Sequence, residues 1–399
     1  MSIEKRKLKL GYIPLTDCLP LVAAAELGLF ADEGLEVELS REASWSTVRD
    51  KLIVGELDGA QLLAPMALSA TLGLGGLRKP MVTAFSLGLN GNAIAVSNAL
   101  FAELGLHAEE ASPLGAAAAL GKVVAQRRER GRQPLVLATV FPFSNHNYLL
   151  RYWLAAAGVD AGRDIKLVAL PPSQMGANLR LGHIDGFCVG EPWNSCAVAE
   201  GHGRCLVTGY EIWQNAPEKV FGVVGDWAMQ HPETHAALLR ALDRACAWID
   251  DDPLQALPLL HRGEHVDVPI EQLQMPFNGE LHVGLGQQRR GRDHFHVFHR
   301  FAANFPWRSH ACWMVDQMAR SGQLPDAVTA SNVIAEVWRS DIYRAVFGDS
   351  RSLPLHDYKS EGEHHLAWQC EGSRGAVTLG PDRLVDAAVY SPQSSPALA

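Results

Sequence analysis

The segment that indicates the fold reads LKLGYIPLTDCLPLVAAAELGLF, residues 8–30. Residues 8–15 are mostly apolar and predict a short buried strand, and residues 19–30 have the apolar spacing of a helix that ends in a glycine-rich turn. The pattern then repeats, with a strand expected at 35–39, a helix at 45–54 and a buried strand at 60–63. Strands separated by helices of this length predict parallel sheets with helices on both faces, and therefore an α/β fold.

The alternation continues into a second set of elements. Strands are expected at 81–89, 93–96, 135–141, 165–170 and 184–189, with helices at 116–128, 148–157 and 174–181. Residues 90–96 and 205–209 read as crossings between two lobes. We therefore expect residues 1–94 to begin lobe 1, 95–205 to form an inserted lobe 2, 206–352 to complete lobe 1 with a helical extension, and 353–399 to form a polar C-terminal segment and tail. A hinged protein of this kind places its ligand in the cleft.

Charge and cysteine content narrow the classes of function. The 399 residues carry 35 Lys and Arg against 44 Asp and Glu, a formal charge of −9. This balance argues against broad nucleic-acid binding, which needs a basic face, but it allows a local pocket for a small anion. Seven cysteines form no CxxC pair, as in reduced intracellular proteins. No apolar export segment or lipid-anchor cysteine follows the basic N-terminus. We expect a cytoplasmic protein with no membrane anchor and no direct nucleic-acid contact.

Sequence motifs of the common enzyme classes are missing. There is no GxxxxGK[ST], HExxH, GxSxG or strand-linked GxGxxG sequence, which favours binding over catalysis. The HFHVFH stretch at 294–299 lacks a strong metal-ligand spacing and reads as a charged helix face with structural histidines. We expect neither a metal nor a cofactor, and no enzymatic activity.

Five residues at predicted strand ends and helix starts are candidates for a binding site. Trp45 offers an indole N–H and a flat face, although a core tryptophan is the plainer interpretation. Asn92 lies in the first crossing, where turn chemistry beside Gly91 explains it equally well. His146 begins a helix, where anions are favoured but capping is more common. Gly190 ends a strand with free backbone N–H groups, and Lys219 begins the strand that returns to lobe 1, where a solvated lysine is the common case.

Several ordered phrases together resemble a known family. They are LGYIPLTD (10–17), ASW (43–45), RD (49–50), DGA (58–60), RYWLA (151–155), FCVGEPWN (187–194) and PEK (217–219). From about residue 8 to 324 the chain resembles the nitrate-binding subunit of cyanobacterial ABC transporters and its bicarbonate-binding relative. The resemblance implies the two-lobed periplasmic-binding-protein fold (type II).

The resemblance also implies a set of ligands for nitrate. The nitrate-binding members hold the anion with a tryptophan, a glutamine, a histidine and a lysine, which correspond here to Trp45, Asn92, His146 and Lys219. Asn92 is shorter than the glutamine it replaces, and the FPFSNH segment at 141–146 differs from the family's glycine-rich version. Nitrate is planar and has only acceptors, so it suits these donors and this cation. The bicarbonate-binding members place a glutamate where Lys219 stands, which favours nitrate or nitrite here.

The expected role combines the resemblance with the absence of an export signal. The chain looks like the cytoplasmic nitrate/nitrite sensor of bacterial nitrate-assimilation regulons, which holds an RNA-binding antiterminator response regulator inactive and releases it when the anion binds. The alternative is the solute-binding component of an ABC-type nitrate transporter. A weaker alternative is an enzyme similar to thiamine-pyrimidine synthases, for which the clustered cysteine motif is missing.

Overall fold

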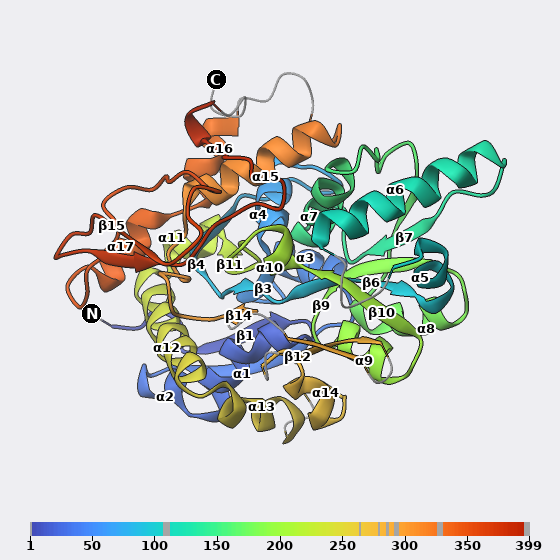
Figure 1. The fold of residues 1–399 in the computed structure, drawn as a ribbon. Coiled ribbons are helices and arrows are strands. Elements are labelled where there is room, and N and C mark those ends of the chain that lie inside the picture. Colours follow the sequence, from blue (N-terminus) through green and yellow to red (C-terminus); the bar gives the residue numbers. More distant parts are fainter. Residues whose placement is uncertain are drawn as a thin grey trace.

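The computed structural model describes residues 2–106, 112–262, 265–277, 280–284, 287–290, 295–324 and 330–394. Its two main sheets have five strands each (Figure 1). The first has the order β2-β1-β3-β11-β4, formed by β1 (Lys7–Tyr12), β2 (Glu36–Arg41), β3 (Gly59–Leu63), β4 (Met81–Ser86) and β11 (Lys219–Val224). The second has the order β10-β6-β9-β7-β8, formed by β6 (Asn92–Ser97), β7 (Val136–Thr139), β8 (Lys166–Ala169), β9 (Gly186–Gly190) and β10 (Gly203–Thr208).

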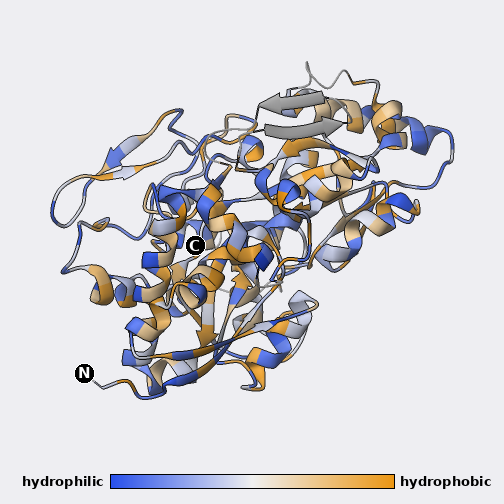
Figure 2. Ribbon diagram, turned by 90° about the horizontal axis from the view of Figure 1, so that it is seen from below, coloured by the Kyte–Doolittle hydropathy of each residue, from blue (hydrophilic) through white to orange (hydrophobic). Residues whose placement is uncertain are grey.

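Helices pack around both sheets. Around the first are α1 (Leu19–Glu26), α2 (Leu29–Asp32), α3 (Trp45–Ile53), α4 (Ala64–Leu72), α11 (Gly225–Gln230), α12 (Pro232–Asp251) and α13 (Pro253–Arg262). Around the second, on the right in Figure 1, are α5 (Asn98–Leu104), α6 (Pro113–Glu129), α7 (Asn145–Ala155), α8 (Met175–Arg180) and α9 (Trp193–Ala199). Many surface helices carry both hydrophobic and hydrophilic residues along their turns, as expected where one side covers a sheet (Figure 2).

The sheets are mixed, which corrects the expectation of purely parallel sheets. β1 pairs in parallel with β2 and β3, and β7 with β8 and β9. In contrast, β11 is antiparallel to both β3 and β4, and β6 is antiparallel to both β9 and β10. The strands that run against their neighbours are β6, which follows the first crossing, and β11, which follows the second. Each is reached by a connection from the other sheet's side and not by a helical crossover within its own sheet, and such a connection allows an antiparallel neighbour.

Two further expectations need correction. The helix expected over 19–30 is interrupted at Gly28, whose φ of 73° is left-handed, so that α1 and α2 are separate. The HFHVFH stretch is not a charged helix face in its described part. His296 belongs to the short strand β14 (His296–Val297), is buried, and is stacked against Phe298 with ring centres 5.6 Å apart; His294 lies outside the described residues.

The C-terminal third adds helices and then an extended segment. Its helices are α14 (Ile270–Gln274), α15 (Arg308–Arg320), α16 (Ala330–Val337), α17 (Ser340–Phe347) and the short η3 (Pro392–Ser394), and its other short strands are β12 (Glu280–Gly284), β13 (Gln287–Arg290), β15 (Trp368–Cys370) and β16 (Val377–Leu379). The remaining short elements lie earlier in the chain and are η1 (Thr16–Cys18), β5 (Leu89–Asn90), η2 (Pro172–Gln174) and α10 (Gly209–Ile212). No helix in the described part of the chain is both long and apolar enough to cross a bilayer.

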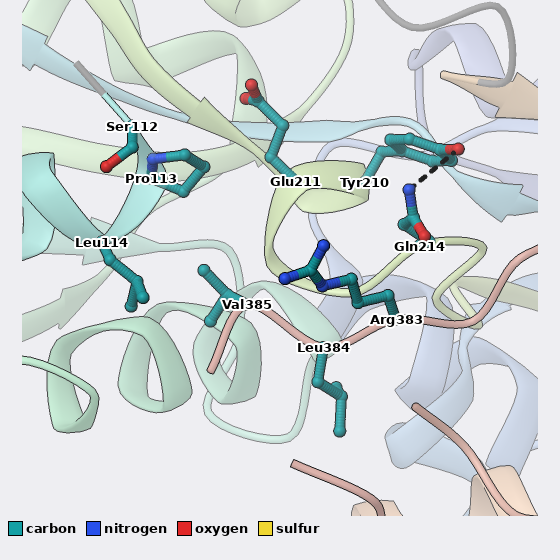
Figure 3. Close-up of a pocket in the computed structure, with 9 residues that line it drawn as sticks. All are labelled: Ser112, Pro113, Leu114, Tyr210, Glu211, Gln214, Arg383, Leu384 and Val385. Atoms are coloured by element: carbon teal, nitrogen blue, oxygen red, sulfur yellow. Dashed lines mark hydrogen bonds between the residues drawn. The ribbon is translucent and has the colours of Figure 1, made fainter. Parts of the chain in front are cut away.

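The extended C-terminal segment bridges distant parts of the molecule. The Val385 N–H donates to the Ile212 carbonyl at 2.8 Å, and the Tyr152 hydroxyl on α7 donates to the Asp386 carboxylate at 2.9 Å. Between this segment, α10 and the start of α6 lies a cavity of about 290 Å³ (Figure 3). The segment therefore packs against the chain that crosses between the sheets and against a helix of the second sheet.

Candidate functional site

Lys219 stands at the centre of a buried cluster of charged side chains. It is the first residue of β11, which lies between β3 and β4, and every residue of this strand is buried. Its Nζ lies 2.7 Å from Asp17 Oδ2 and 2.7 Å from Glu218 Oε1. The Lys219 side chain is only 1% exposed, so its charge is held by these carboxylates rather than by solvent.

Trp45 faces the same lysine from the first sheet's side of the cleft. The Ser44 hydroxyl accepts a hydrogen bond from the Thr47 N–H at 3.2 Å, so the helix α3 begins at Trp45, as the sequence predicts. The Lys219 Nζ lies 5.5 Å from the centre of the Trp45 ring. Trp45 is buried, yet its Nε1 has no hydrogen-bond partner among the described residues. An acceptor for this N–H is therefore left to a ligand or to water.

His146 and Asn92 reach the cluster from the second sheet's side. Ser144 caps α7, which places His146 in the first turn of that helix. The His146 Nε2 lies 3.2 Å from Glu218 Oε1, and the Asn92 Nδ2 donates to Glu218 Oε2 at 2.6 Å. The structure thus brings Asn92 to the expected place, but its amide donor is engaged by a carboxylate.

Gly190 is the fifth of the residues singled out in the sequence. It ends β9 and pairs with Asn92 across the second sheet. A Cβ at this position would lie 3.6 Å from Asp17 Oδ2 and 3.4 Å from a methyl group of Leu15. A side chain larger than alanine would therefore extend into the space beside Asp17. Of the five predicted residues, Gly190 contributes shape here, and Trp45, Asn92, His146 and Lys219 contribute side-chain chemistry.

The sequence analysis missed three polar residues that complete the cluster: Asp17, Gln61 and Glu218. Gln61, on β3, donates to Asp17 Oδ1 at 2.6 Å and accepts from the Ile13 N–H at 3.0 Å. Asp17 and Glu218 both occur in the phrases LGYIPLTD and PEK that carried the family resemblance. Their occurrence in these phrases was the only signal for them, because an exposed and a buried lysine look alike in the sequence, and only a buried one needs carboxylate partners.

The two carboxylates differ in acidity although both touch Lys219. Burial works to raise the pKa of Glu218, but Lys219 and His146 outweigh burial and lower it to about 2. Burial raises the pKa of Asp17 above its usual value, and the attraction of Lys219 offsets this only in part. Burial alone would lower the pKa of Lys219, whereas Asp17 and Glu218 raise it. The firmest negative charge in the cluster therefore belongs to Glu218, and Lys219 stays protonated.

Several buried polar atoms around the cluster have no hydrogen-bond partner among the described residues. They are Thr16 Oγ1, Trp45 Nε1, Asn92 Oδ1, Asn145 Oδ1 and His146 Nδ1. Each belongs to a residue that contacts Lys219 or Glu218 or is next in the chain to one that does. Unpaired buried polar atoms are costly, so their concentration here indicates a site built for a small polar ligand. The indole N–H and the ammonium group suit an anion.

Hydrogen bonds join the segments of the two sheets around the cluster. The Trp193 Nε1 at the start of α9 donates to the Pro14 carbonyl at 3.1 Å, and the Thr16 N–H donates to the Glu191 carbonyl at 2.7 Å. The Asn145 amide group donates to the Pro217 carbonyl. These bonds lie in the same short segments as the charged side chains of the cluster.

A second buried carboxylate with cationic neighbours is Glu361, which contacts Lys359 and His310 in the C-terminal part of the chain. No group of three or more His, Cys, Asp or Glu side chains in the described ranges is arranged to hold a metal ion. The cavity of Figure 3 lies outside the cleft, and its polar side chains include Tyr210 and Gln214, joined by a 3.3 Å hydrogen bond.

Comparisons with known proteins place the chain in a family. Residues 2–257 match the model of the NMT1-like family. The chain belongs to this family. It is 41% identical over 369 residues to the nitrate import ATP-binding protein NrtC of Synechocystis sp., with 91% of the chain and 52% of that protein covered. The bicarbonate transport ATP-binding protein CmpC of the same organism is 39% identical, with 86% of the chain and 50% of that protein covered. The chain thus spans about half the length of these curated relatives.

A solved structure resembles the whole described fold. The crystal structure of the periplasmic nitrate-binding protein NrtA from Synechocystis PCC 6803 superposes with a TM-score of 0.86 at 29% identity, covering 100% of this chain and 98% of that one. The relationship to the nitrate-binding protein family and the two-lobed periplasmic-binding-protein-like α/β fold, both expected from the sequence, are confirmed.

Proposed function

We propose that this family member binds a small monovalent oxyanion, nitrate or nitrite, in the cleft beside Lys219. The observation that carries the proposal is the buried Trp45 indole N–H, which has no partner in the described structure and lies next to a buried ammonium group. Nitrate offers only acceptors and one negative charge, which matches this pair. Support also comes from NrtA, the nitrate-binding protein of the same fold. Binding, not catalysis, is the proposed activity.

Bicarbonate is the competing ligand. It is also planar and monovalent, and its hydroxyl group needs an acceptor. Asn92 Oδ1 and Asn145 Oδ1 are buried near the cluster without a donor in the described residues, and CmpC, which is named for bicarbonate transport, is a relative. Lys219 favours nitrate over bicarbonate, because its ammonium group is a donor and cannot accept the hydrogen bond that the bicarbonate hydroxyl would donate. The titration below includes bicarbonate for this reason.

Calorimetric titration of the purified, anion-depleted chain with nitrate, nitrite, bicarbonate and chloride tests the proposal. A ceiling of ~1.5 kcal/mol per heavy atom gives ~6 kcal/mol for a four-atom anion, or a Kd on the order of tens of micromolar, which sets the range of the titration. We expect saturable binding of nitrate or nitrite and none of chloride. Binding of bicarbonate alone would assign the site to that anion, and binding of none of them would contradict the proposal.

For the biological role, the solute-binding component of an ABC-type nitrate transport system has the broader support. NrtA is a periplasmic nitrate-binding protein, and NrtC is named for nitrate import. In this role the closed, anion-loaded form is the one that docks on the transport machinery. Nitrate-dependent co-purification of the chain with the subunits of a nitrate transporter is the expected result.

A cytoplasmic nitrate/nitrite sensor is the second candidate. One observation favours it over a periplasmic placement. Six cysteines form no disulfide in the structure, namely Cys18, Cys188, Cys196, Cys246, Cys312 and Cys370, and the first five of them are buried. In this role the chain sequesters an RNA-binding antiterminator response regulator and releases it on anion binding. A complex with that regulator that dissociates with nitrate supports the sensor; a complex unaffected by nitrate argues against it.

A further inference from the structure

Glu218 contacts the same side chains that are proposed to bind the anion. Its Oε1 lies 2.7 Å from the Lys219 Nζ and 3.2 Å from the His146 Nε2, and its Oε2 accepts from the Asn92 Nδ2 at 2.6 Å. The Glu218 side chain is 2% exposed. Three of the four side chains proposed to bind the anion are therefore already in contact with one internal carboxylate.

A second carboxylate, that of Asp17, also contacts Lys219. Asp17 Oδ2 lies 2.7 Å from the Lys219 Nζ, and Gln61 fixes Asp17 through a 2.6 Å hydrogen bond to its other oxygen. With Glu218 ionised, the charge of Lys219 is balanced before any ligand enters. An anion in this cleft is thus held mainly by N–H donors and only weakly by surplus charge.

Charge balance matters most for anions that carry two charges. The cost of moving an ion from water into a poorly polarisable interior grows with the square of its charge, so a divalent anion pays about four times the cost of a monovalent anion of equal size. It needs two uncompensated cations in return, whereas a monovalent, weakly hydrated anion needs only donors. A fixed carboxylate within a few ångströms of the ligand adds repulsion that is again larger for the divalent ion.

We propose that Glu218 is the residue that sets charge selectivity in this site, excluding divalent oxyanions such as sulfate while admitting monovalent ones. The inference rests on the proposed function, because it takes the anion to bind beside Lys219. Asp17 acts in the same sense from the other side of Lys219, with a weaker effect, because burial favours its protonated form.

The alternative role for Glu218 is purely structural, as the partner that keeps a buried lysine in place. The two roles differ in what the neutral variant does. If Glu218 is only a structural partner, its neutralisation lowers the stability of the fold and weakens the binding of all anions alike. If Glu218 sets charge selectivity, its neutralisation changes the ratio of the affinities for divalent and monovalent anions. The chain offers a matched control: Glu361 is also buried between a lysine and a histidine, with Lys359 at 2.5 Å and His310 at 3.2 Å, in the C-terminal segment.

The test is calorimetric titration of the full chain with sodium nitrate and sodium sulfate, in the wild type and in the Glu218→Gln, Asp17→Asn and Glu361→Gln variants. We expect the wild type to bind nitrate and not sulfate. In Glu218→Gln the ratio of sulfate to nitrate affinity rises at least ~10-fold, and in Asp17→Asn it rises less. In Glu361→Gln the ratio does not change, although the melting temperature falls. Circular dichroism confirms that each variant is folded.

The outcomes separate the inference from the proposed function. A wild-type chain that binds neither nitrate nor nitrite overturns the proposed function and the inference with it. A wild-type chain that binds nitrate, together with an unchanged sulfate-to-nitrate ratio in a folded Glu218→Gln variant, overturns the inference alone. If Glu218→Gln does not fold, Asp17→Asn decides, because it removes the other carboxylate that contacts Lys219. The rise expected there is smaller, since burial favours the protonated form of Asp17, and no rise at all overturns the inference.

Discussion

The Lys219 ammonium group lies 5.5 Å from the centre of the Trp45 indole ring, with both side chains almost wholly buried. The two residues come from different elements of the first sheet's lobe, the N-terminus of α3 and the start of β11. The ring that carries the unpaired N–H donor therefore lies beside a fixed positive charge. This pairing of donor and charge is what makes the cleft suitable for a small anion.

The Trp45→Phe variant separates the indole N–H from the aromatic face. Phenylalanine keeps a ring beside Lys219 but cannot donate a hydrogen bond. Because a hydrogen bond to a charged group contributes about 1.5–3 kcal/mol, nitrate should bind roughly tenfold more weakly or worse, with the order of anion preference unchanged. Calorimetric titration measures this. Trp213→Phe is the control, since Trp213 is also buried with an Nε1 that lacks a partner in the described residues, and packs on Trp313 instead. Equal losses in both variants would remove Trp45 from the site.

Replacing Lys219 by methionine tests the buried charge cluster itself. The substitution leaves Asp17 and Glu218 in the interior without their cation, and such a loss typically costs about 3–5 kcal/mol of stability. We expect the urea midpoint to fall accordingly and nitrate binding to be lost. The double variant Glu218→Gln, Lys219→Met should recover part of the stability, because it removes one of the two stranded carboxylates. A single variant as stable as the wild type would show that these carboxylates are not ionised together.

Part of the fold was readable from the sequence. The apolar runs that became β1, β3 and β9 and the helix start at Trp45 followed from periodicity and a serine cap, which are local signals. The direction of β6 and β11 was not readable, because alternation of strands and helices does not say from which side a crossing strand enters a sheet. That property is set by the hinge, which is a long-range feature of the chain.

The candidate site was also only partly predictable from the sequence. Trp45, Asn92, His146 and Lys219 were singled out from the sequence, and the structure brings them together around a feature the sequence did not reveal, the Glu218 carboxylate. A glutamate beside a lysine is usually a solvated pair at the surface. Its burial depends on the second sheet's residues closing over it, and sequence spacing carries no information about that contact.

Trp193 should control anion affinity without touching the anion. Its Nε1 donates to the Pro14 carbonyl at 3.1 Å, so Trp193→Phe removes one hydrogen bond between a helix of the second sheet and the chain that follows β1. If the anion binds the form in which this bond is made, the loss lowers the affinity for the anion. A bond of about 1 kcal/mol corresponds to a fall in nitrate affinity of roughly fivefold. Trp153→Phe is the matched control, because the Trp153 Nε1 donates to the Pro113 carbonyl at 2.8 Å within one lobe. That variant should lose stability and keep its affinity. The reverse pattern would mean that the Trp193 bond does not govern closure.

Glu191 should make the stability of the fold depend on pH near neutrality. The residue is buried at the hinge, and burial raises its pKa to about 7 despite hydrogen bonds from the Ser195 N–H and hydroxyl. Between the ordinary value near 4.5 and about 7, the folded chain keeps a proton that the unfolded chain has released. The free energy of unfolding therefore falls as pH rises through this window, by up to about 3 kcal/mol at 1.36 kcal/mol per pK unit.

The Glu191→Gln variant, which is neutral at every pH, isolates this contribution. Measured by urea denaturation between pH 5 and pH 8, the wild type should lose stability relative to Glu191→Gln as pH rises. A difference that stays constant over this range would mean that Glu191 is ionised in the folded chain throughout it.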